Sequence, residues 1–332
     1  MNNKETLFAS KDCHIVINTE ELSNLKEQLF SRGNKRLREI SRIRRIESKR
    51  GEDESVTGDI TADKEDPASI AKRWSDELSR VGVEKAVILC EAPTARDFIF
   101  SVTQFARDKL MAFTNLDPLQ TWSAEDLKRD VARGFVGLNL LPTLQHFHVY
   151  DRRAYGLYEM CERLKIPLMV HFGVSEEIFA DMRFANPLDL QPVARDFPEV
   201  PFIVPGLGSG FLRELLMLMN QCPNVYADTS GIDHCSDYQT QGMDIEGAFD
   251  LLLKVSGSER ILFGSGSGSN PGKKTTYRTE TLRLQEKLFS DLCQEEQRQI
   301  YGETLMSLLK RVDQSKAREK RKSRFSLRSN LG

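Results

Sequence analysis

The sequence has few of the residues that build metal sites and disulfides. Its 332 residues include only five histidines: His14, His146, His148, His171 and His234. Six cysteines are scattered along the chain, and no two of them form a Cys-x-x-Cys pair. This spacing argues against a zinc ribbon or a disulfide scaffold and favours a reduced, cytoplasmic protein.

Long apolar runs and an excess of one charge are also missing. The longest apolar runs, such as Ile166–Val170 and Leu251–Leu253, are far shorter than the roughly 18–20 residues of a membrane helix. The first twelve residues lack the apolar segment of a signal peptide, so we expect no leader and no membrane partner. A net charge of −2 gives no reason to expect a nucleic-acid partner.

Eight short β-rich runs alternate with amphipathic helical patterns. Several runs are continuously apolar, which is typical of parallel strands covered on both faces. The runs are His14–Asn18, Ala86–Cys90, Met111–Asn115, Phe135–Leu140, Leu168–Phe172, Phe202–Pro205, Asn224–Asp228 and Arg260–Gly264. The alternation predicts an α/β fold of the (β/α)8 TIM-barrel class over residues 1–312. A doubly wound sheet is the competitor, but no Gly-x-Gly-x-x-Gly follows the first run.

Two charged segments fall outside this regular spacing. Residues 19–67 form a predicted insertion after strand 1, with a basic block at Lys35–Arg50 and an acidic block at Glu52–Asp66. The acidic block has little apolar surface to bury, so we expect part of the insertion to be mobile. A basic tail follows at residues 313–332. Either segment is a candidate docking site for a protein partner.

Several phrases at the expected strand ends resemble one family. They are DCHIV, ARGFVGLNLLP, YGLYEMCERLKIPLMVHFG, PVARDFPEVPFIVPGLGSG, NVYADTSG and RILFGSGSG, between Asp12 and about Leu309. In order and spacing they resemble the amidohydrolase-related superfamily, in its branch of aminocarboxymuconate-semialdehyde decarboxylase-like enzymes. The resemblance implies a metal-dependent hydrolase-like TIM barrel with one divalent metal, usually zinc, that serves decarboxylation or hydrolysis. Relatives also imply a homodimer.

The ligand set that the resemblance implies is incomplete here. His14 matches the first histidine of the family's His-x-His pair, and His171 matches the histidine after strand five. Val16, Gly206 and Gly266 stand where the family has two further histidines and an aspartate. In the phrase GLNLLP, Asn139 and Leu141 replace a lysine and a histidine of the family.

Two imidazoles alone would hold zinc weakly, because catalytic zinc sites usually have three protein ligands. We therefore expect no cofactor, or a weakly bound divalent metal at His14 and His171, and we name no catalytic residue. Other side chains near the expected barrel mouth are candidate replacement ligands: Cys13, Cys90, Glu91, Asp228, Asp233 and His234. Asp228 is a candidate either to bond His171 or to cap the following turn.

The segment Phe263–Thr275 is rich in glycine and serine and contains Lys273. Such a loop can hold a phosphate or carboxylate through backbone N–H groups and the lysine, so we include Ser265 and Lys273, with Cys13 and Asp228, as possible ligand-binding residues. The P-loop pattern fails, because Ser267 and Lys274 stand where a glycine and a Ser or Thr are needed. Ser209 lacks the flanking residues of a nucleophilic serine.

Two functions remain open from the sequence. The first is a non-catalytic or weakly active homologue that binds a small ligand or a partner, because three expected polar residues are absent together. The second is an active metal-dependent hydrolase or carboxy-lyase that acts on a small carboxylated substrate with recruited ligands. The sequence does not identify the substrate, since specificity in barrels lies in variable loops.

Overall fold

The strands form one parallel sheet that curls into a barrel. The computed structural model describes residues 10–17, 29–31, 35–36, 66–175, 177–232, 243–269 and 277–312. Neighbouring strands follow the order β8-β7-β6-β5-β4-β3-β2-β1-β9. The strands are β1 (Ser10–Ile17), β2 (Val83–Leu89), β3 (Leu110–Thr114), β4 (Gly137–Leu140), β5 (Leu168–Val170), β6 (Phe202–Val204), β7 (Val225–Asp228), β8 (Ile261–Leu262) and β9 (Ser267–Ser269).

The last two strands close the barrel. β8 pairs with β7, whereas β9 pairs with β1. The two short strands are therefore the N-terminal and C-terminal halves of one barrel strand. Between them, the Cys13 N–H donates to the Phe263 carbonyl at 3.0 Å, and the Gly266 N–H donates to the His14 carbonyl at 3.1 Å. The predicted eight-stranded barrel is therefore confirmed.

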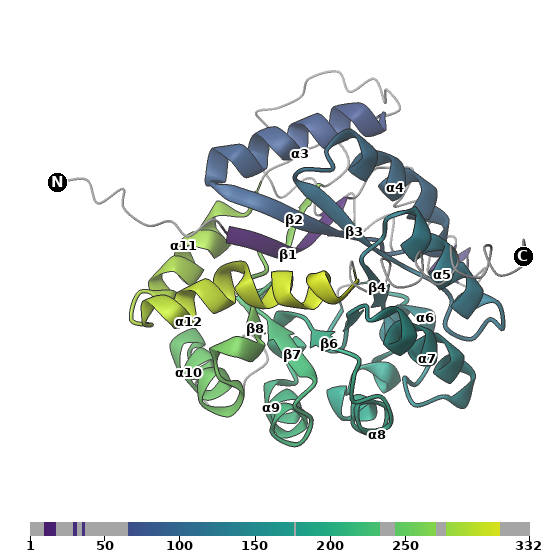
Figure 1. The fold of residues 1–332 in the computed structure, drawn as a ribbon. Coiled ribbons are helices and arrows are strands. Elements are labelled where there is room, and N and C mark those ends of the chain that lie inside the picture. The colour runs from purple at the N-terminus through teal and green to yellow at the C-terminus, as the bar shows by residue number, and fades with distance from the viewer. Residues whose placement is uncertain are drawn as a thin grey trace, which may run out of the picture.

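Helices surround the sheet (Figure 1). The longer ones are α3 (Pro67–Val81), α4 (Arg96–Phe105), α5 (Ser123–Arg133), α7 (Tyr155–Leu164), α9 (Leu212–Gln221), α10 (Ile245–Ser256) and α11 (Thr279–Phe289). Shorter ones are α6 (Pro142–Gln145), α8 (Gln191–Asp196) and α12 (Gln294–Arg298); a π-helical turn, Gln299–Glu303, and a helix over residues 304–312 follow α12. No helix within the described ranges is long and apolar enough to cross a membrane.

Local sequence sets these helix boundaries, as α3 illustrates. The Asp66 carboxylate accepts hydrogen bonds from the Ala68 and Ser69 backbone N–H groups, and Pro67 takes the first helical position, where no N–H donor is needed. Gly82 ends the helix in a left-handed conformation with φ of 78°. The buried face of α3, which includes Trp74 and Leu78, packs toward the sheet.

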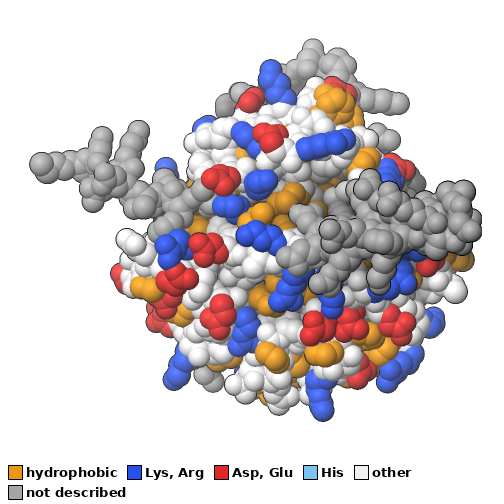
Figure 2. Space-filling model, in the orientation of Figure 1, with side chains coloured by type: hydrophobic (Ala, Val, Ile, Leu, Met, Phe, Trp, Pro, Cys, Tyr) orange, Lys and Arg blue, Asp and Glu red, His pale blue; other side chains and the backbone are white. Residues whose placement is uncertain are grey.

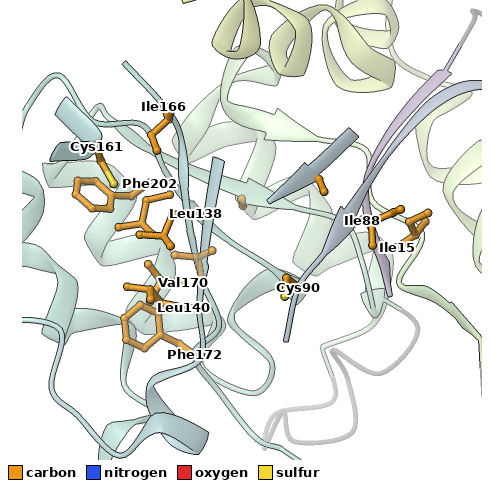
Figure 3. Close-up of a cluster of buried hydrophobic side chains, with 14 of the residues drawn as sticks. Ile15, Ile88, Cys90, Leu138, Leu140, Cys161, Ile166, Val170, Phe172 and Phe202 are labelled. Carbon is orange, nitrogen blue, oxygen red and sulfur yellow. The ribbon is translucent and has the colours of Figure 1, made fainter. Parts of the chain in front are cut away.

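The core has two layers that alternate along each strand. Outward side chains pack against the helices; Figure 3 shows several of them, among them Leu138, Leu140, Phe202 and Cys161 of α7. Inward side chains fill the barrel with a second apolar cluster: Cys13, Val87, Leu89, Phe113, Met169, Ile203 and Leu262. Both faces of the sheet are thus covered, as the continuous apolar runs predict.

The helix over residues 304–312 belongs to the inner core. Its Leu305, Leu308 and Leu309 are buried in the same cluster as the inward strand residues. In Figure 1 this helix, drawn in yellow, crosses the end of the barrel that faces the viewer. Figure 2 shows positive and negative side chains intermixed on the same face, around a central group of hydrophobic side chains. This helix therefore closes one end of the barrel.

A bulge in β1 places a buried carboxyl group at the seam. Asp12 pairs with Ala86 and Ile15 with Ile88, so β1 has one more residue than β2 over this stretch. The Asp12 carboxyl group accepts hydrogen bonds from the Tyr277 hydroxyl at 2.6 Å, the Ser265 N–H at 3.0 Å, the His14 N–H at 2.9 Å, and the Ser265 hydroxyl. Burial raises the pKa of Asp12 above its ordinary value, while these donors limit the rise.

The charged insertion and the basic tail remain predictions. Most of residues 19–67 and all of residues 313–332 lie outside the described ranges. Within the insertion, Phe30 and Ser31 are buried, so the structure shows one point at which this segment packs on the barrel.

We predict that Asp12→Ala lowers the free energy of unfolding by about 2–4 kcal/mol, because it leaves several buried donors without an acceptor. Tyr277→Phe removes one of those donors and should cost about 1 kcal/mol. Urea unfolding followed by circular dichroism measures both values. An Asp12→Ala variant as stable as the parent would show that the seam does not depend on this carboxyl group.

Candidate functional site

A layer of polar side chains lies above the apolar layer at the C-terminal ends of the strands. Residues that point inward alternate along each strand, and beyond the apolar layer most strands carry a polar residue, whereas β6 and β8 are followed by Pro205 and Gly264. The polar residues are His14, Glu91, Asn115, Asn139, His171 and Asp228. In a TIM barrel this end carries the active site, so this polar layer is the candidate functional site.

The centre of the layer is an ion pair between β1 and β7. The His14 Nδ1 atom lies 3.1 Å from Asp228 Oδ2, and the His14 side chain is only 12% exposed, while that of Asp228 is fully buried. Burial disfavours a charged imidazole, but the Asp228 carboxylate outweighs this effect and raises the pKa of His14. Burial likewise acts to raise the pKa of Asp228, yet His14 and neighbouring donors lower it. The raised pKa of His14 and the lowered pKa of Asp228 both favour the charged forms, an imidazolium and a carboxylate.

Hydrogen-bond donors surround the Asp228 carboxylate. Oδ1 accepts from the Gly206 N–H at 3.1 Å, the Ser230 N–H at 2.8 Å and the Ser230 hydroxyl. Oδ2 accepts from His14 and, at 3.6 Å, from the Cys13 thiol. Five donors thus occupy both oxygens, and Asp228 both bonds a histidine and caps the turn after β7. The histidine is His14, whereas the sequence analysis had considered His171.

Cys13 is a thiol and not a thiolate in this setting. Burial raises its pKa well above the ordinary value, and the negative charges of Asp228 and Asp12 raise it further. A metal ligand or a nucleophile requires the thiolate form. Cys13 therefore acts as a weak hydrogen-bond donor to Asp228 within the inner core.

The two histidines that match family ligands are brought together. The ring centroids of His14 and His171 lie 5.3 Å apart, with an angle of 70° between the ring planes. His14 comes from β1 and His171 follows β5, so the contact spans the barrel mouth. These are the two residues that the resemblance names for a weakly bound metal; whether either residue binds a metal stays a prediction.

The residues that the structure describes do not fit the metal that the family implies. Across the described residues, no group of three or more His, Cys, Asp or Glu side chains is placed to hold a metal ion. Val16, Gly206 and Gly266 offer no side-chain ligand, and donors already occupy the carboxylate that bonds the His14 imidazole, that of Asp228. A catalytic zinc ion needs three protein ligands and an open position, which this arrangement does not supply.

The two glycine positions also have an unusual backbone conformation. Gly206 and Gly266 have φ of 63° and 62°, the left-handed region that L side chains rarely adopt. A Cβ atom on Gly206 would lie 2.6 Å from the Ser209 hydroxyl oxygen. A Cβ atom on Gly266 would point toward Ser230 and a guanidinium nitrogen of Arg278. A ligand side chain would therefore collide with Ser209 at position 206, whereas at position 266 the obstacle is the left-handed backbone and not the neighbouring atoms.

The remaining predicted residues lie either away from the polar layer or outside the described ranges. Ser265 is buried at the seam, where its backbone N–H and hydroxyl donate to Asp12. Cys90 faces the outer core and donates to the Ala92 carbonyl. Lys273, Asp233 and His234 lie outside the described ranges. The predicted phosphate cradle therefore stays untested, and its one described member, Ser265, serves the barrel seam.

An apolar cluster covers part of the mouth. Leu141 and Leu144 follow β4, Phe179 follows β5, and Phe30 comes from the predicted insertion; all four are buried together. The rings of Phe30 and Phe179 stack with centroids 6.1 Å apart. We call this group the mouth cap.

Tyr277 is a site-adjacent residue that sequence reasoning missed. Its hydroxyl reaches Asp12 from beyond the glycine-rich loop, 265 positions along the chain. No motif surrounds Tyr277, so only the three-dimensional closure of the barrel reveals this contact. Burial raises the pKa of Tyr277 well above its usual value, which keeps the hydroxyl a donor.

With this geometry established, comparison with known proteins identifies the class. A family model described as "Amidohydrolase" matches residues 71–307, which is most of the chain. The protein belongs to the amidohydrolase family, as the strand-end phrases predict. No curated protein sequence matches the chain.

Solved structures with the same barrel include three informative examples. An uncharacterised TIM-barrel protein from Bordetella bronchiseptica has a TM-score of 0.64 and 16% identity over 91% of this chain and 99% of its own. A 5-carboxyvanillate decarboxylase from Novosphingobium aromaticivorans, complexed with manganese and a nitrobenzoic acid, has a TM-score of 0.64 and 13% identity over 92% of this chain and 96% of its own. A probable 2-pyrone-4,6-dicarboxylic acid hydrolase from Acinetobacter baumannii, with citric acid bound, has a TM-score of 0.59 and 13% identity over 91% of this chain and 99% of its own. At these identities the similarity establishes the fold alone.

We predict that Asp228→Asn lowers the pKa of His14, because the carboxylate is what favours the imidazolium. In the parent, the stability due to the charged imidazole is complete below about pH 6.5, the unfolded pKa, and is lost as the pH rises through the higher folded pKa. In Asp228→Asn, the free energy of unfolding should not fall in this way as the pH rises. Imidazole NMR titration and urea unfolding between pH 5 and about 9 measure both effects. An unchanged His14 titration in Asp228→Asn would contradict the ion pair.

Proposed function

We propose that this protein is a non-catalytic or weakly active amidohydrolase homologue that binds a small molecule at the barrel mouth without a resident metal. The family and barrel are established by the comparisons; the absence of metal catalysis is our proposal. The observation that carries it is the Asp228 carboxylate, whose two oxygens are occupied by five donors, among them His14 and the backbone of Gly206.

An imidazolium replaces the positive charge that a metal would provide. A buried carboxylate is stable only when it is paired or hydrogen-bonded. In this chain His14 supplies the pairing charge, so a divalent cation is not needed to keep the site intact. The mouth cap adds apolar side chains that follow β4 and β5, the strands that carry or precede Asn139 and His171.

The alternative is an active metal-dependent hydrolase or carboxy-lyase for a small carboxylated substrate. Its support comes from the similar structures, one a decarboxylase complexed with manganese and one a probable hydrolase, and from the contact of His14 with His171. Such an enzyme would need ligands beyond these two histidines. Cytoplasmic location, a homodimer and a protein partner for the charged segments remain further proposals.

Metal analysis separates the two functions. Protein purified without chelator should contain far less than one equivalent of zinc, manganese or iron by inductively coupled plasma mass spectrometry, because the donors do not fit. The double variant His14→Ala His171→Ala should give the same metal content. One equivalent of metal in the parent, lost in the double variant, would establish the alternative.

Restoring the family residues should not restore the metal. We predict that Val16→His Gly206→His Gly266→Asp binds no stoichiometric zinc, because a side chain at 206 meets Ser209 and one at 266 points toward Arg278. Each non-glycine residue at a left-handed position also costs about 1–2 kcal/mol of stability. Metal analysis and urea unfolding check this. Tight zinc binding by the triple variant would show that only side chains, and not the backbone, were lost.

A further inference from the structure

The mouth cap is a small apolar cluster that is separate from the two core clusters. Leu141, Leu144 and Phe179 belong to the loops that follow β4 and β5, whereas Phe30 comes from the insertion after β1. The Phe30 ring is 5% exposed and stacks on the Phe179 ring with an angle of 24° between the ring planes. The cluster therefore consists of one phenyl ring from the insertion that packs on three side chains of the barrel loops.

Hydrogen bonds within the barrel loops fix the three side chains on which Phe30 packs. The Leu144 N–H donates to the Leu141 carbonyl at 3.0 Å. The two loops are joined by His146, whose Nε2 atom donates to the Phe179 carbonyl at 2.8 Å. Neither bond involves Phe30, so the loops themselves form the surface that receives its ring. We call Leu141, Leu144 and Phe179 the phenyl pocket.

The contact of Phe30 with this pocket is of limited strength. Burial of one phenyl ring favours the docked state by about 10- to 100-fold, before the cost of ordering the chain is subtracted. The neighbouring Ser31 is also buried, and its hydroxyl group has no hydrogen-bond partner within the described residues, which opposes docking. The undocked state is therefore a minor population that a competing ligand can select.

We propose that Phe30 is an autoinhibitory occupant of the phenyl pocket, and that the phenyl group of a small molecule competes with it there. This inference rests on the proposed function, because it names the ligand class and the regulation of the same mouth. Leu141 follows the inward-facing Asn139 by two positions, and Leu140 between them faces the outer core. The phenyl pocket is therefore next to the polar layer, and undocking of Phe30 vacates an apolar site there.

The occupant indicates the class of ligand. Phe179 presents an aromatic face to the Phe30 ring, and the two leucines provide the other apolar contacts. The three members of the phenyl pocket carry no charged or polar group, so the pocket favours a neutral, apolar group. Stacked aromatic rings gain free energy beyond that of the apolar area they bury. The favoured ligand is thus a small molecule with a phenyl group.

The unmodified full chain provides the first test. Benzene is the probe, and cyclohexane is its matched control, similar in size but without an aromatic face. Benzene should shift the methyl NMR signals of Leu141 and Leu144, whereas cyclohexane should bind several-fold more weakly. Amide hydrogen exchange in a peptide that contains Phe30 should become faster as benzene binds, because the ring is displaced.

A pair of variants provides the second test. Phe30→Ala should bind benzene about tenfold more tightly than the parent at Leu141 and Leu144, because the competing ring is gone. Phe249→Ala is the matched control, since Phe249 is also a buried ring beside another, Phe289, but belongs to the outer core. The control should bind benzene at the two leucines as the parent does. It should also lose more stability than Phe30→Ala, because Phe30 contributes only its own docking.

Equal benzene affinity of the parent and Phe30→Ala would overturn the proposal, since Phe30 would then not compete. Three other results would also overturn it: benzene binding without faster exchange around Phe30, equal binding of benzene and cyclohexane, or a loss of stability in Phe30→Ala as large as in Phe249→Ala. Metal content is measured on the same preparation. Stoichiometric metal contradicts the proposed function, whereas a metal-free protein in which benzene does not compete with Phe30 contradicts only this inference.

Discussion

Closure of the barrel through β1 is the constraint on which the rest of the structure depends. The bulge between Asp12 and Ile15 lets three consecutive side chains reach three different environments. Asp12 bonds the segment after β8, Cys13 enters the inner core, and His14 meets Asp228 in the polar layer. A regular strand would have placed Asp12 and Cys13 on opposite faces. The same bulge therefore contributes both to the closure of the barrel at Asp12 and to the position of His14 in the polar layer.

The polar layer is divided into two halves of different chemistry. On one side His14 pairs with the Asp228 carboxylate, and backbone and hydroxyl donors bond the same carboxylate. On the other side, the buried Oδ1 atoms of Asn115 and Asn139 have no hydrogen-bond partner within the described residues. The buried carboxylate of this amidohydrolase barrel is thus compensated by a histidine, hydroxyl groups and main-chain N–H groups.

The sequence predicts the barrel well and the site only in part. Continuous apolar runs and regular spacing predict all eight strand positions, because parallel strands buried on both faces leave this signature. The phrases around His14 and His171 also predict that these two rings share the mouth. The His14–Asp228 pair could not be predicted, since two strands 214 positions apart must first be placed in register. The contacts of Tyr277 and the unsatisfied oxygens of Asn115 and Asn139 depend on the same long-range closure.

The division of the last barrel strand into β8 and β9 has a consequence for folding kinetics. The bonds that join this strand to Asp12 link residues 253 positions apart, so their formation must overcome a large loop-closure entropy. Contacts of such high sequence separation form slowly compared with local helices and neighbouring strand pairs. His14 and Asp228 stand on strands that come together through this seam. A chain in which seven strands have paired but the seam is open would therefore have most of its helices and no binding site.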